Sequence, residues 1–247
     1  MSLLAARGIT KHFGGVTALE DVSFEVMEGE TLGLIGPNGS GKTTFFNVAS
    51  GLMRPDAGRI FFDGVELTRL TPPRIARLGV ARTFQISRPL AGLTVVENLL
   101  PGIYFGSERL SGPEARRRAM ELLELVALDG KAHWSAHDLT MWETRLLELA
   151  RALGVGSRLV LLDEIFAGLA PADIPETLDL VRRVRREMST TMVVVEHVMA
   201  AVMALCDRIV VIASGRLVTE GAPQEVVRHP RVLEVYLGSK EVPDAQG

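Results

Sequence analysis

The chain has 247 residues, which is long enough for one large globular domain with an inserted subdomain. Its 27 Lys and Arg residues against 30 Asp and Glu residues give a formal net charge of −3, so it lacks the basic excess typical of nucleic-acid-binding proteins. Hydrophobic residues make up 47% and charged residues 23%, a balance that favours a folded protein over a disordered one. The single cysteine, Cys206, excludes an internal disulfide and fits a reducing compartment.

The sequence predicts neither a secretory signal nor a membrane span. The N-terminus becomes charged too early for a signal peptide. The most apolar stretch, 192–213, contains the ionisable residues Glu196, His197, Asp207 and Arg208. Because a charge at the centre of a spanning helix costs about 2.5–3.5 kcal/mol on insertion scales, we expect this stretch to be buried in protein instead.

The predicted elements begin with two segments of alternating apolar and polar residues, 17–26 and 59–65, which predict an N-terminal antiparallel β subdomain. Short apolar runs then alternate with helical patterns, which predicts an α/β fold with a mainly parallel sheet covered on both faces. The predicted strands are 32–35, 159–162, 192–195 and 209–212, and the helices among them are 43–50, 176–187 and 198–206. Residues of about 87–151, with helical patterns at 113–128 and 139–153, are predicted to form a helical subdomain inserted in the α/β core.

A glycine-rich segment between a predicted strand and a predicted helix matches the pattern G-x-x-x-x-G-K-[ST]. In such a loop the backbone N–H groups turn inward to a phosphate chain, and the helix presents its positive end to it. Lys42 is placed to contact the β- and γ-phosphates, and the hydroxyl of Thr43 to ligate Mg²⁺. The order strand, loop, helix disfavours the alternative of a purely structural turn. The predicted nucleotide-binding residues are Gly36, Pro37, Asn38, Gly39, Ser40, Gly41, Lys42, Thr43 and Thr44.

Two adjacent acids, Asp163 and Glu164, follow the apolar run 159–162. Ligands of α/β folds bind at the carboxyl ends of the strands, so these acids are expected beside the phosphate loop. We predict that Asp163 holds Mg²⁺ through water and that Glu164 polarises the attacking water. Taken alone, the pair is equally well explained as a solvated strand end; the phosphate loop makes the functional interpretation the stronger one.

With these residues placed, the chain resembles an ATP-binding subunit of an ABC transporter over nearly all of its length, as one domain covering 1–247. The resemblance implies a P-loop NTPase fold with a RecA-like core. It implies that Phe13 stacks on adenine, that Gln85 contacts Mg²⁺ and senses the membrane subunits, and that His197 contacts the γ-phosphate. Each residue also has an alternative, non-functional explanation: Phe13 as an aromatic of the core, Gln85 as an amide in a loop, and His197 as a hydrogen-bonded histidine of the core. The catalytic residues so implied are Lys42, Gln85, Glu164 and His197, and the metal ligands are Thr43, Gln85 and Asp163.

The stretches 11–19, 82–85, 93–98 and 229–238 are similar to those of ATPases of branched-chain amino acid importers. This similarity implies an ATPase that powers uptake of branched-chain or other hydrophobic amino acids, with ATP and Mg²⁺ as cofactors. It implies a second ATP-binding subunit, in a homo- or heterodimer, together with integral membrane permease subunits and, indirectly, a substrate-binding protein. The location implied is peripheral, on the cytoplasmic face of the inner membrane. Urea, amides or lipids stay open as other cargoes.

One family motif departs from its usual form. Where the family has Leu-Ser-Gly-Gly-Gln, this chain has Leu139, Thr140, Met141, Trp142 and Glu143. The resemblance implies that this signature closes over the ATP held by the partner subunit, with a hydroxyl and the N–H groups of a helix N-terminus. We expect the ring of Trp142 to obstruct that approach. Glu143 adds an anion near the phosphates, and an unscreened repulsion at about 4 Å costs roughly 4 kcal/mol at an effective dielectric of about 20.

Two smaller departures are Ile165, where proline usually follows the two acids, and Ala170, where Asp or Asn is common. Together these features predict an asymmetric subunit, which binds ATP on its own loop but contributes a weak signature to its partner's site. A nucleotide-binding regulatory subunit with weak hydrolysis is the main alternative. A soluble ABC ATPase acting on ribosomes or DNA and an ATP-dependent kinase or ligase are disfavoured, the former by the absence of net positive charge and the latter by the absence of a recognisable acceptor pocket.

Overall fold

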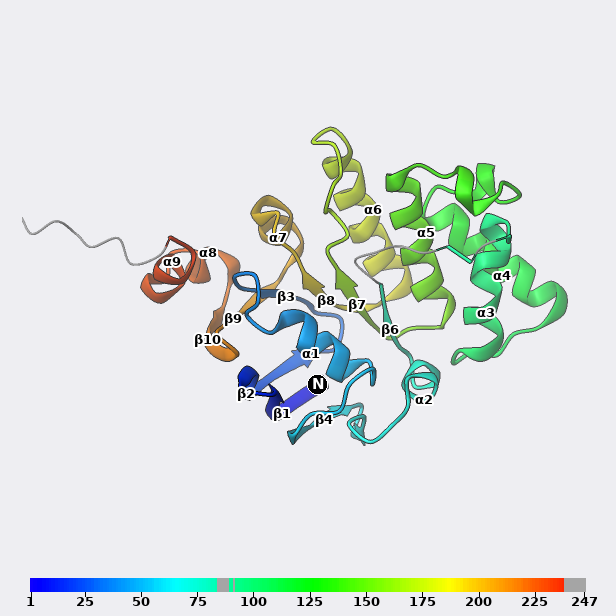
Figure 1. Ribbon diagram of the computed structural model, residues 1–247. Helices are drawn as coiled ribbons and strands as arrows, with labels where there is room; N and C mark the ends of the chain where they lie inside the picture. The colour runs from blue at the N-terminus through cyan, green and yellow to red at the C-terminus, as the bar shows by residue number, and fades with distance from the viewer. Residues whose placement is uncertain (84–88, 91, 238–247) are drawn as a thin grey trace, which may run out of the picture.

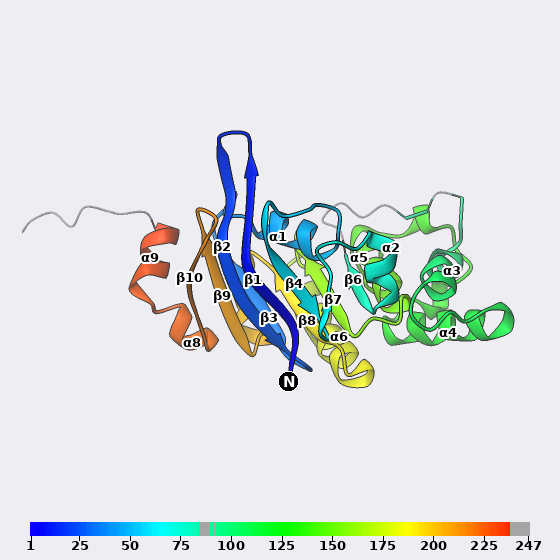
Figure 2. The ribbon, with the colours of Figure 1, turned by 90° about the horizontal axis from the view of Figure 1, so that it is seen from below.

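A computed structural model describes residues 1–83, 89–90 and 92–237 of the chain (Figure 1). Its first sheet is antiparallel, has the strand order β2-β1-β4-β5 and confirms the predicted antiparallel strands. Figure 2 shows the hairpin of β1 and β2 extending away from the body of the molecule. Its tip is the turn between Phe13, the last residue of β1, and Val16, the first of β2. The strands are β1 (Ser2–Phe13), β2 (Val16–Met27), β4 (Ala57–Phe62) and β5 (Val65–Glu66).

The second sheet has the order β10-β9-β3-β8-β7-β6, in which β6, β7, β8, β3 and β9 are parallel and β10 is antiparallel to β9. Its strands are β3 (Thr31–Ile35), β6 (Val80–Arg82), β7 (Leu159–Asp163), β8 (Thr191–Val195), β9 (Arg208–Ala213) and β10 (Arg216–Gly221). All four predicted strands are confirmed. The strands β3, β7 and β8 are buried along their whole length, as expected for a parallel sheet covered on both faces.

Figure 1 shows α6 and α7 above the mixed sheet, α1 and the antiparallel sheet below it, and α3, α4 and α5 packed together at one end. The helix α4 ends before the predicted residue 128, since Ala127 has a left-handed φ of 58°. The predicted subdomain boundary near residue 87 lies outside the described residues. The helices are α1 (Lys42–Ala49), α2 (Pro72–Arg77), α3 (Val95–Phe105), α4 (Gly112–Leu125), α5 (Met141–Gly154), α6 (Asp173–Met188), α7 (Met199–Leu205), α8 (Pro223–Val226) and α9 (Pro230–Leu237), with short 3₁₀ turns at Asp129–Lys131 and Ala136–Asp138.

Two hydrophobic cores lie on opposite faces of the mixed sheet. Alternate residues of one strand enter different cores: Val193 and Val195 of β8 face the core with α1 and the antiparallel sheet, and Met192 and Val194 face the helices. This explains why the central positions of β7 and β8 are apolar without alternation. The sheet is therefore packed on both faces, and the loops that follow its strands start from a rigid base.

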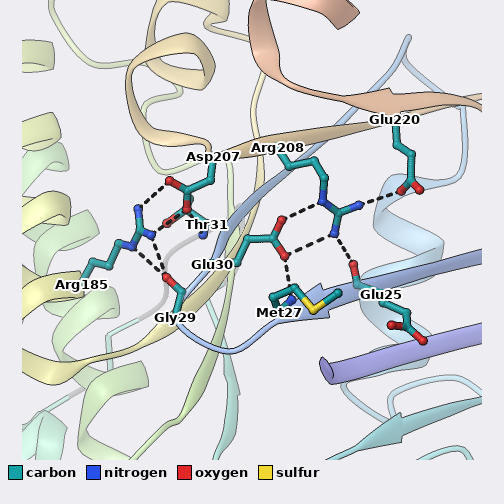
Figure 3. Close-up of polar contacts among 9 residues, drawn as sticks. All are labelled: Glu25, Met27, Gly29, Glu30, Thr31, Arg185, Asp207, Arg208 and Glu220. Atoms are coloured by element: carbon teal, nitrogen blue, oxygen red, sulfur yellow. Dashed lines mark hydrogen bonds and ion pairs between the residues drawn. The ribbon is translucent and has the colours of Figure 1, made fainter. Parts of the chain in front are cut away.

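Arg208, at the start of β9, connects the two sheets (Figure 3). Its Nε lies 2.8 Å from Glu30 Oε1, its Nη1 lies 2.7 Å from Glu220 Oε2, and its Nη2 donates to the carbonyl oxygen of Glu25. The other carboxylate oxygen of Glu30 accepts the N–H of Met27 at 2.7 Å. The turn that leads into β3 is thereby bonded to β2 on one side and to β9 on the other, and Arg208 also bonds β9 to β10.

A second ion pair holds the beginning of β3 (Figure 3). Arg185 of α6 lies 2.6 Å from Asp207 Oδ2 and also donates to the carbonyl oxygen of Gly29 at 2.7 Å. The same Asp207 oxygen accepts the N–H of Thr31 at 2.8 Å. Because α6, β9 and the start of β3 share these bonds, the strand that ends at the phosphate loop is fixed at its origin.

These contacts predict an unequal effect of two arginine substitutions. Arg208→Met leaves the carboxylate of Glu30, which is 9% exposed, without its main cationic partner, and we expect it to lower the free energy of unfolding by about 2–3 kcal/mol. The matched control is Arg216→Met, whose partner Glu20 is exposed, and which should cost at most about 1 kcal/mol. Urea unfolding measures both, and equal losses would contradict the role given to Arg208.

Candidate functional site

The phosphate loop occupies the space between the end of β3 at Ile35 and the start of α1 at Lys42. Two of its glycines have no room for a side chain: a Cβ on Gly36 would lie 1.9 Å from the carbonyl oxygen of Ile212, and one on Gly41 would lie 2.4 Å from that of Ala18. Both glycines also have positive φ, 153° and 110°. The loop is thus pressed against β9 and β2, and its N–H groups lie at the positive end of α1.

Lys42 lies inside this loop. Its ammonium donates to the carbonyl oxygens of Gly36 at 2.7 Å and Pro37 at 2.9 Å. Burial lowers the pKa of Lys42, and the carboxylates of Glu164 and Asp163 oppose that shift. The loop thus surrounds the ammonium of Lys42, which donates its hydrogen bonds to carbonyl oxygens of the loop itself. A bound phosphate would replace these carbonyl oxygens as the acceptor of those hydrogen bonds.

A hollow of about 240 Å³ opens over the loop. It brings together three predicted groups from distant parts of the sequence: the phosphate loop, Glu164 and His197. Its lining is Ala18, Asn38, Gly39, Ser40, Gly41, Lys42, Thr43, Thr44, Glu164 and His197. Phe13 lies at the hairpin tip outside this lining, 47% exposed, with the Lys11 ammonium 5.8 Å from its ring. An exposed ring at a protruding tip is accessible to a flat ligand.

Glu164 and His197 are in direct contact. The Nε2 atom of His197 lies 3.1 Å from Glu164 Oε1. This proximity follows from strand pairing, since β7 and β8 are parallel neighbours with Asp163 opposite Val195 and both end at the same edge of the sheet. Glu164 has a left-handed φ of 51°, and its N–H donates to the Val195 carbonyl oxygen at 2.9 Å. Strained backbone of this kind is common at functional sites.

Asp163 is buried, 4% exposed, and belongs to a cluster that the sequence did not predict. Its Oδ2 lies 2.8 Å from Nη2 of Arg82, whose Nη1 donates to Asn47 Oδ1 at 2.7 Å, and its N–H donates to the hydroxyl of Thr83 at 3.0 Å. Arg82 therefore ties β7 to α1. The sequence signal for this pair was weak: Arg82 and Asp163 are the last residues of two neighbouring parallel strands. Gln85, the other predicted metal ligand on this side, lies outside the described residues.

Glu196 is a second acid that sequence reasoning did not place in the site. It follows β8 directly, is 2% exposed, and accepts the N–H of Phe166 at 2.8 Å on Oε1 and the N–H of His197 at 3.3 Å on Oε2. Burial raises the pKa of Glu196 to about 7, against the effect of these N–H bonds, and the nearby charge of Glu164 adds to the rise. The signal was an acid between the apolar run 192–195 and a histidine.

The signature segment begins α5, and Glu143 does not stand there as an unpaired charge. Glu143 and Thr140 form a capping box: the Thr140 hydroxyl accepts the Glu143 N–H at 3.2 Å, and Glu143 Oε2 accepts the Thr140 N–H at 3.0 Å. Its other oxygen lies 2.6 Å from the Lys131 ammonium. Burial raises the pKa of Glu143, but the bonds from Lys131 and Thr140 outweigh it and lower the pKa below its usual value. Within this chain the charge of Glu143 is therefore paired with that of Lys131, and the expected repulsion at the partner's site stays a prediction.

The ring of Trp142 is held inside this chain, and its expected obstruction of the partner's ATP stays a prediction. The indole Nε1 donates to the hydroxyl of Thr177 on α6 at 3.0 Å, and the ring packs against the helical core. Leu139 packs against the same core, whereas Met141 is exposed with its sulfur near Gly168. Sequence alone could not show this, since it does not reveal that α6 offers an acceptor for the indole N–H.

The other two departures have simple structural explanations. Ile165 is buried in the helical core, a position for which an apolar side chain suffices. Ala170 is exposed, and its carbonyl oxygen accepts the N–H of Asp173 at 2.9 Å at the start of α6.

Comparison with known proteins agrees with this geometry. The family model described as "ABC transporter" matches residues 19–167, and one described as "Branched-chain amino acid ATP-binding cassette transporter" matches residues 216–242. A curated relative, "Probable branched-chain amino acid transport ATP-binding protein LivG" of Archaeoglobus fulgidus, is 37% identical over 98% of this chain and 97% of its own length.

Two solved structures are similar as well. The ADP conformation of MJ1267, an ATP-binding cassette of an ABC transporter, has a TM-score of 0.87 and 31% identity, covering 96% of this chain and 99% of that one. The dimeric post-hydrolysis state of the ATP-binding cassette MJ0796, bound to ADP and Pi, has a TM-score of 0.79 and 26% identity, covering 89% and 98%.

A P-loop NTPase fold whose phosphate loop, acid and histidine share one hollow defines an ATP-binding cassette. The chain belongs to the ABC transporter family, and it is an ATPase coupled to transport. Within the described part of the chain, no helix is both long and apolar enough to cross a membrane.

The raised pKa of Glu196 predicts that this residue makes folding less favourable as the pH rises. Unfolding returns its pKa to the ordinary value of 4.5, so between about pH 4.5 and pH 7 the folded chain binds more protons than the unfolded chain and is destabilised with rising pH. Glu196→Gln removes this titration. From pH 5 to pH 8 the free energy of unfolding should therefore shift in favour of the variant by about 2–3 kcal/mol relative to the parent. Urea unfolding across that range tests this, and a difference that does not change with pH would contradict it.

Proposed function

We propose that this chain is the ATP-binding and ATP-hydrolysing subunit of an importer for branched-chain or other hydrophobic amino acids, bound peripherally at the cytoplasmic face of the membrane. The observation that carries the proposal is the contact of Glu164 with His197 in the hollow over the phosphate loop. The cargo class is supported by the relative's name and by the branched-chain family model at residues 216–242. Urea, amides and lipids stay the alternatives, and the membrane proteins that co-purify with the chain discriminate among them.

The residues of the hollow fit the hydrolysis of a bound triphosphate. The N–H groups of the loop and the ammonium of Lys42 would hold the phosphates, with the charge that develops on the γ-phosphate placed next to Lys42. Glu164 would orient and polarise the attacking water, and His197, 3.1 Å away, would contact the γ-phosphate and keep Glu164 in place. Phe13, exposed at the hairpin tip, would stack on the adenine.

A divalent cation is also expected in the working site. The Thr43 hydroxyl and the Asp163 carboxylate are oxygen donors of the type that Mg²⁺ prefers; Thr43 lines the hollow, and Asp163 directly precedes Glu164, which lines it as well. They would hold the ion together with Gln85. When bound, Mg²⁺ neutralises part of the phosphate charge. Arg82 keeps one oxygen of Asp163 engaged, which orients the carboxylate before the nucleotide arrives.

The partners are proposed on the same basis. A second ATP-binding subunit would close over the nucleotide. The similar cassette MJ0796, which is a dimer when bound to ADP and Pi, supports this arrangement. The permease subunits would dock at a mostly apolar hollow of about 280 Å³ whose lining includes Leu52, Ile75, Pro101 and Val155. The substrate-binding protein would act on the permeases and not touch this chain.

Lys42→Ala tests nucleotide binding. Loss of the buried ammonium removes the charge that faces the β- and γ-phosphates, so we expect the dissociation constant for Mg-ATP to rise by about ten- to a hundredfold. Calorimetry on the purified chain measures this, and amino acid uptake in cells should fall with it. Lys131→Ala is the matched control, since it lies in the signature region and should keep the chain's own ATP affinity. Unchanged affinity in Lys42→Ala would refute the proposal.

The signature supports a refined form of the asymmetric hypothesis. The capping box already uses two donors at the N-terminus of α5, those of Thr140 and Glu143, and the Glu143 carboxylate occupies the position that favours an anion. The site completed by this signature, on the partner's phosphate loop, would therefore turn over slowly. A heterodimer would keep one efficient site, whereas a homodimer would have two impaired ones. Negligible turnover of the assembled complex would favour the regulatory-subunit alternative.

Two signature variants test this explanation in the assembled complex. Glu143→Gln keeps the capping geometry but removes the negative charge, so we expect ATP turnover to rise by about two- to fivefold. Trp142→Phe should leave turnover unchanged, since the indole ring already points to α6. A steady-state ATPase assay measures both. A gain in Trp142→Phe with none in Glu143→Gln would support the obstruction argument and exclude the electrostatic one.

A further inference from the structure

The two catalytic side chains lie on separate segments. Glu164 begins the segment that follows β7, and His197 begins the one that follows β8. Parallel pairing ends at Asp163 and Val195, and the last backbone bond between the segments is the one from the Glu164 N–H to the Val195 carbonyl oxygen. Beyond that point the relative position of the segments depends on side-chain contacts.

The side chain of Glu196, the residue before His197, makes such a contact with the segment after Glu164 and also bonds to the backbone of its own neighbour, His197. Oε1 accepts the N–H of Phe166, two residues after Glu164, at 2.8 Å. Oε2 accepts the N–H of His197 at 3.3 Å. The turn after Glu164 is closed on itself by the Ala167 N–H, which donates to the Glu164 carbonyl oxygen at 3.1 Å. One buried carboxyl group thus bridges the backbone next to each catalytic residue.

The chemistry of this position is specific to a carboxylate. Glu196 is 2% exposed beside the charge of Glu164, and burying an acid in such surroundings costs stability. Two oxygens of one side chain can each accept a backbone N–H, whereas the amide of glutamine supplies one acceptor and turns a donor toward the other N–H. An apolar residue would accept neither bond.

We propose that Glu196 is a positioning residue, whose carboxyl group couples the segment after Glu164 to the segment that carries His197 and thereby holds these two side chains 3.1 Å apart. The role rests on the proposed hydrolysis of ATP at this site. Glu196 itself does not touch the nucleotide hollow, since its own side chain is buried behind the two segments. Its loss therefore acts on the rate of the reaction more than on nucleotide affinity.

The experiment compares the parent with Glu196→Gln and Glu196→Ala in the assembled complex and in the full-length chain. We expect turnover at saturating Mg-ATP to fall by about ten- to a hundredfold in Glu196→Ala and by less in Glu196→Gln, which keeps one acceptor. The dissociation constant for Mg-ATP should stay within about twofold of the parent, because the phosphate loop is unchanged. Amide hydrogen exchange should be at least about tenfold faster at Phe166 and His197, and unchanged at Val194.

Glu30→Gln is the matched control, since it removes another buried carboxylate that lies far from the catalytic residues and is bonded to Arg208. It should lower thermal stability without changing turnover at a temperature well below unfolding. Parental exchange at Phe166 and His197 in Glu196→Ala, or parental turnover in both Glu196 variants, would overturn the assignment. If the parent complex itself does not hydrolyse ATP, the proposed function fails, and the exchange rates still decide whether Glu196 couples the segments.

Discussion

The parallel pairing of β3, β8 and β7 is the constraint on which the site depends. Gly33 of β3 stands opposite Val194 of β8, and Val195 of β8 stands opposite Asp163 of β7. Because these strands run in one direction, whatever follows each of them leaves the sheet at the same edge. The register of the strands therefore brings the phosphate loop, Glu164 and His197 together, and this placement does not depend on contacts among their side chains.

The support of that edge is stiff for identifiable reasons. The origin of β3 is bonded to α6 and β9 through Asp207, and its end is locked where Gly36 meets the carbonyl of Ile212 without room for a Cβ. Each central strand also contributes side chains to two cores. A loop that must present its N–H groups to a phosphate benefits from this rigidity, since donors fixed in place need no reorganisation when charge develops.

The signature segment shows that a residue's chemistry depends on what packs against it. By type, Glu143 and Trp142 are an unfavourable anion and an obstruction. In the folded chain, Glu143 is bonded to Lys131 and caps its own helix, and Trp142 donates to Thr177. The departure from the family pattern is thus a locally satisfied structure in the folded chain, with both polar groups bonded to partners in the same chain.

The sequence by itself determined the fold class, the family and the phosphate loop, because these follow from local patterns: apolar runs of strand length, and glycines at positions where a Cβ does not fit. It also predicted the antiparallel strands correctly, whereas it placed the end of α4 too far along the chain. The roles of the individual site residues, those of Gln85 and Phe13 included, and the boundaries of the helical subdomain stay predictions. Only the tertiary structure decided that Arg82 bonds to Asp163, that Glu196 bridges two segments, and where Trp142 and Glu143 point. Those outcomes depend on partners contributed by distant segments, and a linear pattern carries no information about which donor meets which acceptor after the chain has packed.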